Sequence, residues 1–215
     1  MDFTIEPEFQ AKLDWARDFV ENKVRPLEFI YDYDKDAAYD IENKPLRKII
    51  KRLQQEVKDQ GLWAVHLPPH LGGQGFGAVK LTYINELFGT SAFGPVIFGC
   101  QGPDTGNMEI LAMFGTDEQK EKYLQPVLDG EIFSTFAMTE PQGGSDPTNL
   151  RCVARRDGDD WVITGDKWFA SNANHAEFMI VMTATDPEAP PHSRATMFIV
   201  PTSSPGFEIV RNIGF

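Results

Sequence analysis

The sequence predicts an α+β fold, with a run of helices followed by a run of strands. Amphipathic stripes and helix caps fill the N-terminal part of the chain, whereas strand-forming segments separated by turn residues fill the remainder. Since the two kinds of segment do not alternate, βαβ units are not expected. We place a domain boundary near Gly130, which gives an all-α helical domain over 1–130 and a strand-rich domain over 131–215.

Two amphipathic stripes predict the first helices. In residues 8–24, apolar side chains recur at steps of three and four residues. Pro26 is expected to end this helix or to begin its exit, because proline lacks a backbone N–H and its ring clashes with the preceding turn. The second stripe covers residues 46–57 behind Pro45, which a first helical turn tolerates. Gly61 is the expected stop of this second helix.

A loop and three further helical segments complete the first domain. Residues 67–77 are rich in Pro and Gly, which predicts a loop that joins two helices. The spacing of apolar residues predicts helices around residues 81–88 and 108–113. Thr116 and Gln119 form a capping-box pattern, which predicts the start of the next helix.

Beyond Gly130 the composition favours strands. β-branched and aromatic residues gather in five segments, at residues 132–139, 151–156, 161–170, 178–185 and 195–202. Residues 157–160, Asp-Gly-Asp-Asp, supply turn residues for a hairpin between the second and third segments.

Composition and charge exclude several classes of protein. The 215 residues are 41% apolar and include sixteen Phe, which is typical of a packed globular protein. The formal net charge of -12 argues against a nucleic-acid surface, and any contact to a polyanionic ligand must be local or come from chain outside this sequence. No apolar run approaches the roughly 18 residues that a membrane-spanning helix needs. The first residues lack a basic region followed by an apolar core, so secretion is not expected.

Common catalytic and metal-binding signatures are incomplete. Cys100 and Cys152 lack Cys-x-x-Cys spacing, so neither a disulfide framework nor a zinc site is predicted, and a reducing compartment is expected. The glycine loop at residues 72–77 lacks the spacing and the strand-to-helix context of a dinucleotide fingerprint. His66 and His70 are separated by two prolines that oppose a regular helix, so loop histidines are favoured over metal ligands.

Residues 136–146 combine hydroxyls, small residues and glycine where a predicted strand gives way to a turn. Ser145 lies in this segment, but no Gly-x-Ser-x-Gly elbow surrounds it, so a serine hydrolase is not favoured. Glycine lets backbone donors approach a ligand closely, and a hydroxyl orients a heteroaromatic ring by hydrogen bonding. The residues therefore permit a cofactor site, while a strand end with a polar turn remains the alternative.

Two segments in order along the chain resemble the acyl-CoA dehydrogenase family. Residues 137–146, Ala-Met-Thr-Glu-Pro-Gln-Gly-Gly-Ser-Asp, resemble the family signature at the start of its middle β-domain. Residues 161–172, Trp-Val-Ile-Thr-Gly-Asp-Lys-Trp-Phe-Ala-Ser-Asn, resemble its strand and flavin-side loop. The helical half is similar as well, including residues 67–77 and 115–120. The resemblance implies a β-barrel-like or β-sandwich second domain, incomplete in this sequence, and a C-terminal helical bundle that is missing from it.

The resemblance implies that seven residues bind FAD, namely Phe136, Met138, Thr139, Gly144, Ser145, Phe169 and Ser171. Thr139 would donate to the pyrimidine side of the isoalloxazine ring. Phe169 and Ser171 stand where the family often has Trp and Thr, so an aromatic wall and a hydroxyl are kept while their size changes. Ser145 would also lie near the acyl-CoA thioester, with a turn-stabilising hydroxyl as the alternative.

Glu140 and Asp146 are expected to belong to the architecture of the loop rather than to act as acid or base. In the family a carboxylate of the C-terminal domain removes the α-proton of the acyl group while a hydride leaves the β-carbon for the flavin, which gives a 2-enoyl-CoA. No catalytic residue and no metal ligand is therefore predicted in this sequence. Asn149 stands where the family usually has a smaller residue, which weakens the match at the outer end of the loop.

The resemblance thus implies an FAD-dependent oxidoreductase of fatty acid and lipid metabolism that dehydrogenates acyl-CoA. It implies electron transfer to an electron-transfer flavoprotein or a similar acceptor, a homo-oligomer, and a location in the bacterial cytoplasm or the mitochondrial matrix. Two alternatives stay open. One is an acyl-CoA oxidase-like flavoenzyme, whose reduced flavin reacts with oxygen, and the other is a noncatalytic fragment that binds acyl-CoA or a protein.

Overall fold

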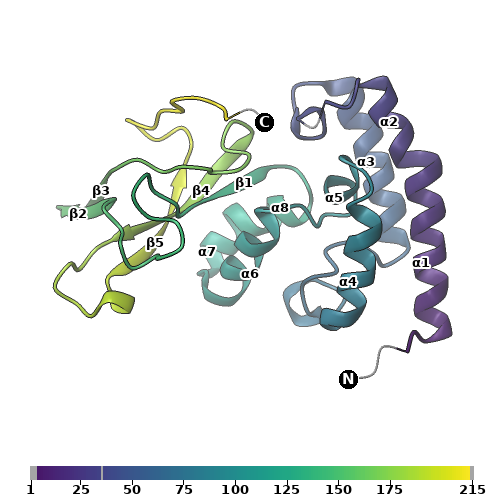
Figure 1. Cartoon of the computed structure of the whole chain (residues 1–215), viewed down its shortest axis with the longest axis horizontal. Coiled ribbons are helices and arrows are strands. Elements are labelled where there is room, and N and C mark those ends of the chain that lie inside the picture. The colour runs from purple at the N-terminus through teal and green to yellow at the C-terminus, as the bar shows by residue number, and fades with distance from the viewer. Residues whose placement is uncertain (1–3, 35, 214–215) are drawn as a thin grey trace. The chain divides into compact units, whose positions relative to one another are not determined.

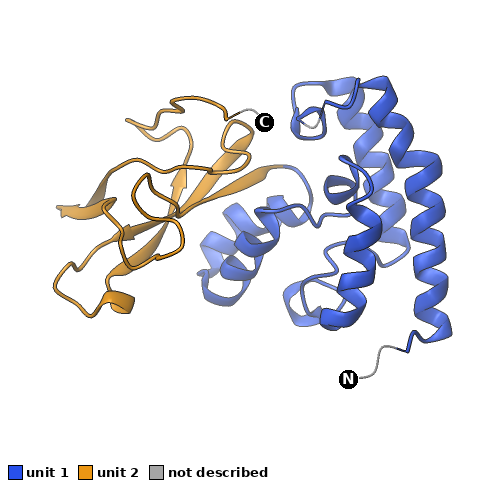
Figure 2. Ribbon diagram, in the orientation of Figure 1, with its two compact units in different colours: residues 1–131 blue, residues 132–215 orange. Residues whose placement is uncertain are grey.

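The computed structural model describes residues 4–34 and 36–213. The chain divides into two compact units, residues 1–131 and residues 132–215 (Figure 2). Helices build the first unit and strands build the second (Figure 1). This order confirms the predicted α+β fold class. Within the described residues, no helix combines the length and the apolar character that crossing a membrane requires.

The first helix continues past Pro26, so the prediction that this residue ends it is wrong. Three segments follow one another without a break: α1 (Pro7–Phe19), a π-helical turn (Val20–Val24) and α2 (Arg25–Ile30). In the π-helical turn the amide of Arg25 donates to the carbonyl of Val20, five residues back. The extra residue places Pro26 in the first turn of α2, where a missing N–H does not interrupt the helix.

α3 (Lys44–Asp59) carries the second apolar stripe, and four buried side chains of that stripe face the core of the helical unit. The side chain of Asn43 caps the start of the helix by accepting a hydrogen bond from the Leu46 amide at 3.2 Å. Beyond its last turn, Gly61 adopts a left-handed conformation with a φ of 63°. This glycine confirms the predicted stop, because other residues adopt that conformation only at a cost.

Three helices follow the loop after α3: α4 (Gly77–Phe88), α5 (Gly94–Ile97) and α6 (Asp104–Phe114). The short α5 was not predicted. Phe98, directly after α5, stacks on Phe88 with 3.8 Å between ring centroids and meets Phe19 edge-on at 5.8 Å. All three rings are buried. They join α1, α4 and α5 in one aromatic core cluster.

The helical unit ends in another continuous helix with a π-helical turn in its middle. Its three segments are α7 (Asp117–Gln119), the π-helical turn (Lys120–Leu124) and α8 (Gln125–Leu128). Both hydrogen bonds of the predicted capping box between Thr116 and Gln119 are present, at 3.0 and 3.2 Å, so this prediction is confirmed. The indole N–H of Trp63 donates to the carbonyl of Leu128 at 2.8 Å and satisfies one acceptor at the end of α8.

The described part of the second unit forms one sheet with five strands, which are β1 (Phe133–Ala137), β2 (Val153–Asp157), β3 (Asp160–Thr164), β4 (Ala176–Ala184) and β5 (Ala195–Pro201). β4 is central, since it pairs in parallel with β1 and antiparallel with β5. It touches the start of β2 through the pair Val153 and Ala184. The strands run in the order β1-β4-β2-β3, so β1 and β3 are not neighbours.

β2 and β3 form the predicted hairpin, in which Gly158 adopts a φ of 64° at the turn. β3 ends at Thr164, so the predicted continuation of this strand to residue 170 is wrong. Gly165 follows with a φ of 153°, and a Cβ on it would lie 2.7 Å from the Cα of Cys152. The chain therefore leaves the sheet at Gly165, at a close approach that only glycine permits.

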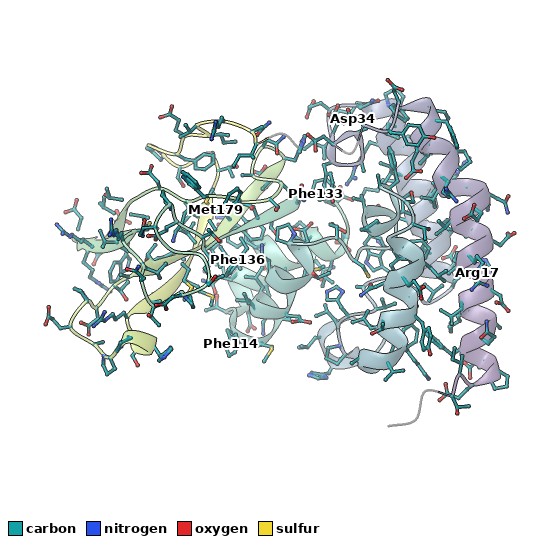
Figure 3. The ribbon with its side chains drawn as sticks, viewed as in Figure 1. Arg17, Asp34, Phe114, Phe133, Phe136 and Met179 are labelled. Atoms are coloured by element: carbon teal, nitrogen blue, oxygen red, sulfur yellow. The ribbon has the colours of Figure 1, made fainter. Side chains whose placement is uncertain are left out.

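The interior of the sheet unit lies along β1 and β4. Ala137, Met179 and Val181 are buried together, and Val200 and Phe207 pack against them. Figure 3 labels Phe133 and Phe136 on β1 and Met179 on β4. Phe133 is buried, whereas Phe136 is half-buried. This difference leaves one aromatic side chain of β1 partly accessible next to the residues that follow the strand.

Candidate functional site

Two segments that are distant in sequence meet in the sheet unit, the residues after β1 and the residues after β3. The amide of Trp168 donates to the carbonyl of Thr139 at 2.8 Å. The hydroxyl of Thr135 donates to the carbonyl of Ser171 at 2.6 Å. Because β1 and β3 are not paired in the sheet, side chains and irregular backbone make this connection. These are the two segments that the sequence predicts to form one site.

The loop after β1 is organised around the carboxylate of Glu140. Its backbone forms reciprocal hydrogen bonds with Gly143 at 3.0 and 3.1 Å, which close the turn. The buried carboxylate accepts backbone N–H bonds from Arg151 at 2.6 Å and from Cys152 at 3.0 Å, and a side-chain bond from Gln142 at 2.5 Å. Glu140 therefore fixes the loop to the start of β2, which agrees with the architectural role expected for it.

Lys167 completes the surroundings of Glu140 from the second segment. Its ammonium donates to the Glu140 carboxylate at 2.7 Å and to the carbonyl of Met138 at 3.0 Å. The two side chains are only 10% and 2% exposed, so this is a buried ion pair. Burial would raise the pKa of the Glu140 carboxyl, but hydrogen bonds from Lys167 and from two backbone amides outweigh it and hold that pKa below its ordinary value. Glu140 is therefore ionised at neutral pH.

The predicted site residues differ in exposure. Phe136, Met138 and Thr139 are half-buried, whereas Gly144, Ser145, Phe169 and Ser171 are exposed. The structure joins Thr139 to the segment that carries Phe169 and Ser171. A Cβ on Gly144 would lie 3.9 Å from the Thr139 methyl group, so this glycine is also adjacent. Within the described residues, no hydrogen bond joins Ser145 to the second segment.

Three hydroxyls of the predicted site are available to a ligand. Among the residues that the structure describes, the side chains of Thr139, Ser145 and Ser171 form no hydrogen bond with the protein. Each hydroxyl carries one donor and two acceptor positions. An isoalloxazine ring presents carbonyl and N–H groups at its edge, which such hydroxyls match.

Phe169 adopts an unusual backbone conformation. Its φ of 56° lies in the left-handed region, which bulky residues rarely adopt, and its side chain is 63% exposed. The ring of Trp168 meets the Phe169 ring edge-on, with 5.8 Å between the centroids. An exposed aromatic ring held on strained backbone is typical of ligand-facing positions.

Lys167 and Trp168 were missed as functional candidates, although both lie in the segment that carries the family resemblance. One sequence signal points to Lys167, because it is the only lysine in residues 132–215. No sequence pattern indicates the close contact of Gly165 with Cys152. It depends on how β2 and the chain after β3 approach each other in space.

The histidines of the helical unit do not form a metal site with other described residues. His66 is half-buried, and neither of its ring nitrogens has a hydrogen-bond partner in the described part of the chain. Burial lowers the pKa of this histidine to about 4. It is therefore neutral at physiological pH. Within the described residues, no group of three His, Cys, Asp or Glu side chains is arranged to hold a metal ion. A groove of about 560 Å³, lined by residues of the π-helical turn at Val20–Val24, of α2 and of α3, contains none of the predicted site residues.

Comparison with protein families matches both units. The model described as "Acyl-CoA dehydrogenase, N-terminal domain" matches residues 6–131, and the one described as "Acyl-CoA dehydrogenase, middle domain" matches residues 135–214. Acyl-CoA dehydrogenase family member 10 of Mus musculus is 38% identical over 201 residues, which are 90% of this chain and 18% of that protein. Probable acyl-CoA dehydrogenase FadE2 of Mycobacterium tuberculosis is 39% identical over 91% of this chain and 48% of its own length.

Solved structures agree with these matches. Two structures from Mycobacterium abscessus, both described as probable acyl-CoA dehydrogenases, align with TM-scores of 0.83 and 0.72 at 33% and 26% identity. They cover 98% and 99% of this chain, which spans 54% and 53% of theirs. A glutaryl-CoA dehydrogenase of Mycobacterium smegmatis, solved in complex with FADH2, aligns over 94% of this chain and 47% of its own, at 25% identity and a TM-score of 0.67. The chain spans less than half the length of the two curated relatives, the mouse and the Mycobacterium tuberculosis proteins.

Proposed function

The chain belongs to the acyl-CoA dehydrogenase family, and on that premise we propose that it supplies part of the FAD and acyl-CoA site of an enzyme that converts an acyl-CoA thioester into a 2-enoyl-CoA. FAD, when bound, would accept the electrons removed from the acyl chain. The residues of this chain would hold and orient the cofactor. The base of the reaction would come from outside these 215 residues.

One observation carries the proposal for FAD. The half-buried Thr139, whose hydroxyl has no hydrogen-bond partner among the described residues, is held beside a strained, exposed aromatic segment at Phe169 to Ser171. A flavin ring needs an apolar wall and a few placed polar groups, and this pairing offers both. Phe136, Met138 and Gly144 would extend the contact surface along the strand end. The relative described in complex with FADH2 supports the same cofactor.

Ser145 is proposed to contact the thioester or the arm of acyl-CoA. It is exposed and its hydroxyl has no partner within the described residues. The turn that precedes it is closed by Glu140 and Gly143 without help from the Ser145 side chain. A turn-stabilising role for this hydroxyl is therefore less supported than a ligand contact.

FAD binding is tested first, by flavin fluorescence titration of the purified chain. Thr139→Val removes the hydroxyl and keeps the shape, so the affinity for FAD should fall about fivefold to tenfold, the value of one hydrogen bond. Thr164→Val is the matched control, because Thr164 is an exposed residue of β3. Equal affinities of the wild type and Thr139→Val would remove Thr139 from the flavin site, and a wild-type chain that binds no FAD would contradict the proposal for this chain.

The reaction is tested by adding a panel of acyl-CoAs anaerobically to the flavin-loaded protein and recording the visible spectrum. Bleaching of the flavin supports dehydrogenation. Rapid peroxide formation after admission of oxygen supports an acyl-CoA oxidase-like enzyme instead. Binding of acyl-CoA by a chain that does not retain or reduce flavin supports a noncatalytic binding fragment.

We also propose that the protein passes electrons to an electron-transfer flavoprotein or a similar acceptor, and that it works as a homo-oligomer in fatty acid and lipid metabolism. Exposed apolar side chains on the sheet unit, such as Trp161, Val162 and Met197, support a further contact surface. Light scattering after size-exclusion chromatography measures the number of subunits.

Location in the cytoplasm or the mitochondrial matrix stays a prediction.

A further inference from the structure

The two proposed flavin-facing segments are anchored to the sheet at their ends, and a few hydrogen bonds join them in between. β1 and β3 are not paired with each other, but pairing anchors both segments at their ends: Val153 of β2 pairs with Thr164 of β3, and Ala176 of β4 pairs with Phe133 of β1. Within the described residues, four hydrogen bonds join β1 and its following loop to the residues after β3, and two of them come from one side chain, that of Lys167. Between these paired ends, Lys167 therefore supplies half of the hydrogen bonds that set the spacing of the two segments.

The acceptors of Lys167 both belong to the loop after β1. The ammonium reaches the carbonyl of Met138 at 3.0 Å and the carboxylate of Glu140 at 2.7 Å. The next residue, Trp168, donates its amide to the carbonyl of Thr139 at 2.8 Å. Two consecutive carbonyls are thus fixed by two consecutive residues of the other segment. The backbone of Thr139 is set by these bonds while its hydroxyl stays available.

The carboxylate of Glu140 gives this connection its rigidity. One oxygen accepts from Lys167 and Cys152, and the other accepts from Gln142 and Arg151. With two hydrogen bonds on each oxygen, the carboxylate has no freedom to rotate. Lys167 is therefore attached to a group that is itself fixed to the start of β2.

We propose that Glu140 and Lys167 form a positioning pair, which sets the distance between Thr139 and the Phe169–Ser171 segment so that both meet one flavin ring. The inference rests on the proposed FAD site and assigns a role to two residues that do not touch the cofactor themselves. A difference in distance of about 1 Å between such groups is enough to weaken binding strongly. A buried ion pair without this role would contribute to stability alone.

The test uses hydrogen exchange at the Trp168 amide, followed by NMR in the full 215-residue chain. In Lys167→Met, which keeps an unbranched side chain one atom shorter and removes its charge and donors, this amide should exchange at least about tenfold faster than in the wild type. The amide of Ile180 in central β4 should be unchanged. Lys44→Met is the control variant, because Lys44 pairs with Glu42 on the surface, where their side chains are 73% and 81% exposed.

Glu140→Gln provides a second variant if Lys167→Met does not fold, since Gln keeps the shape and one carbonyl acceptor. It should also accelerate exchange at Trp168. The double variant should lose no more protection than the worse single variant, because the two residues act as a unit. Wild-type exchange at Trp168 in both single variants, or losses in the double variant that simply add, would overturn the inference.

A second measurement concerns the cofactor itself. Lys167→Met should bind FAD at least about tenfold more weakly and with an altered visible spectrum, while its helical and sheet content by circular dichroism is unchanged. Wild-type affinity together with a wild-type spectrum would overturn the positioning role. A wild-type chain that binds no FAD would refute the proposed function instead, and the exchange rates at Trp168 would still decide whether the pair positions the two segments.

Discussion

Glu140 illustrates how a carboxylate in a conspicuous motif serves structure. It is buried, ionised and surrounded by four donors, so its oxygens have little capacity left to take up a proton. Hydrogen bonds to the charged form lower the pKa, which makes the group a weak general base. These contacts explain why no catalytic role is assigned to it. In the proposed reaction, another group would have to remove the α-proton.

The low pKa of Glu140 predicts how the stability of the sheet unit depends on pH. A folded-state pKa below the unfolded value of about 4.3 contributes stability that is present above pH 4.3 and is lost as the pH falls through the folded pKa. The difference in unfolding free energy between the wild type and Glu140→Gln should therefore be large at pH 7 and shrink below pH 4. Urea unfolding followed by NMR signals of β4 measures it, and a difference that is constant with pH would contradict the prediction.

Gly165 and Gly158 form a matched pair for a second prediction. Both have positive φ, but a Cβ on Gly165 would meet the backbone of Cys152, whereas one on Gly158 would meet nothing within 4 Å. Gly158→Ala should cost about 1 kcal/mol for the left-handed backbone alone. Gly165→Ala should cost about 3 kcal/mol or more, because overpacking adds to the strain.

Thermal unfolding of the two variants checks the comparison. Equal losses would mean that the chain after β3 moves away from Cys152 without cost.

Sequence could identify the two segments of the candidate site but not how they are joined. Thr139 and Ser171 belong to recognisable motifs, each readable on its own. Lys167 pairs with Glu140 across 27 positions of sequence, between the loop after β1 and the loop after β3, two strands that are not paired with each other. Such a contact is set by the three-dimensional approach of the loops, for which hydrophobic periodicity carries no information.

At the scale of elements, the two π-helical turns share one arrangement. Each is followed by a helix whose second residue is proline, Pro26 in α2 and Pro126 in α8. In each, the residue before the proline donates to a carbonyl five positions back, Arg25 to Val20 and Gln125 to Lys120. Helix stripes and caps were predictable from sequence. The continuation past Pro26 was not, because a π-helical turn needs one extra residue and the packing that supports it.

Gly106 offers a prediction within one helix. It lies inside α6, is exposed, and a Cβ on it would meet nothing within 4 Å. Replacing a helical glycine with alanine stabilises by about 1 kcal/mol, because the unfolded chain loses conformational freedom. Gly106→Ala should therefore raise the melting temperature of the helical unit by a few degrees. A lower melting temperature would show that this position must stay free of a side chain for packing that the described residues do not reveal.

At the scale of the whole molecule, the sequence predicted the order of helices and strands but not their partners. Five strand segments were placed correctly, although the third extends only to Thr164. Long-range packing determines that β4 pairs in parallel with β1 and antiparallel with β5. We propose that the two compact units are independent folding domains with a boundary near Gly130. Limited proteolysis at that boundary tests it.

The net charge of -12 leads to a prediction about the proposed ligand. Acyl-CoA carries several negative phosphates, so the chain repels it at long range. Raising the ionic strength from about 0.02 to 0.2 M shortens the Debye length to below about 10 Å and should increase the affinity for acyl-CoA about twofold to threefold. An acyl-pantetheine without phosphates is the control, and its affinity should not change. A fall in acyl-CoA affinity with salt would indicate a local basic site.

The two cysteines provide natural reporters of opening, one in each unit. Cys100 belongs to the helical unit, where burial raises the pKa of its thiol to about 12, and Cys152 is buried against Gly165 in the sheet unit, where burial also raises the thiol pKa. Both thiols are therefore poor nucleophiles while the protein is closed. Alkylation by iodoacetamide, quantified for each cysteine by mass spectrometry, would follow the exposure of the half-buried Cys100 and of the buried Cys152 separately in an unlabelled, unmutated chain.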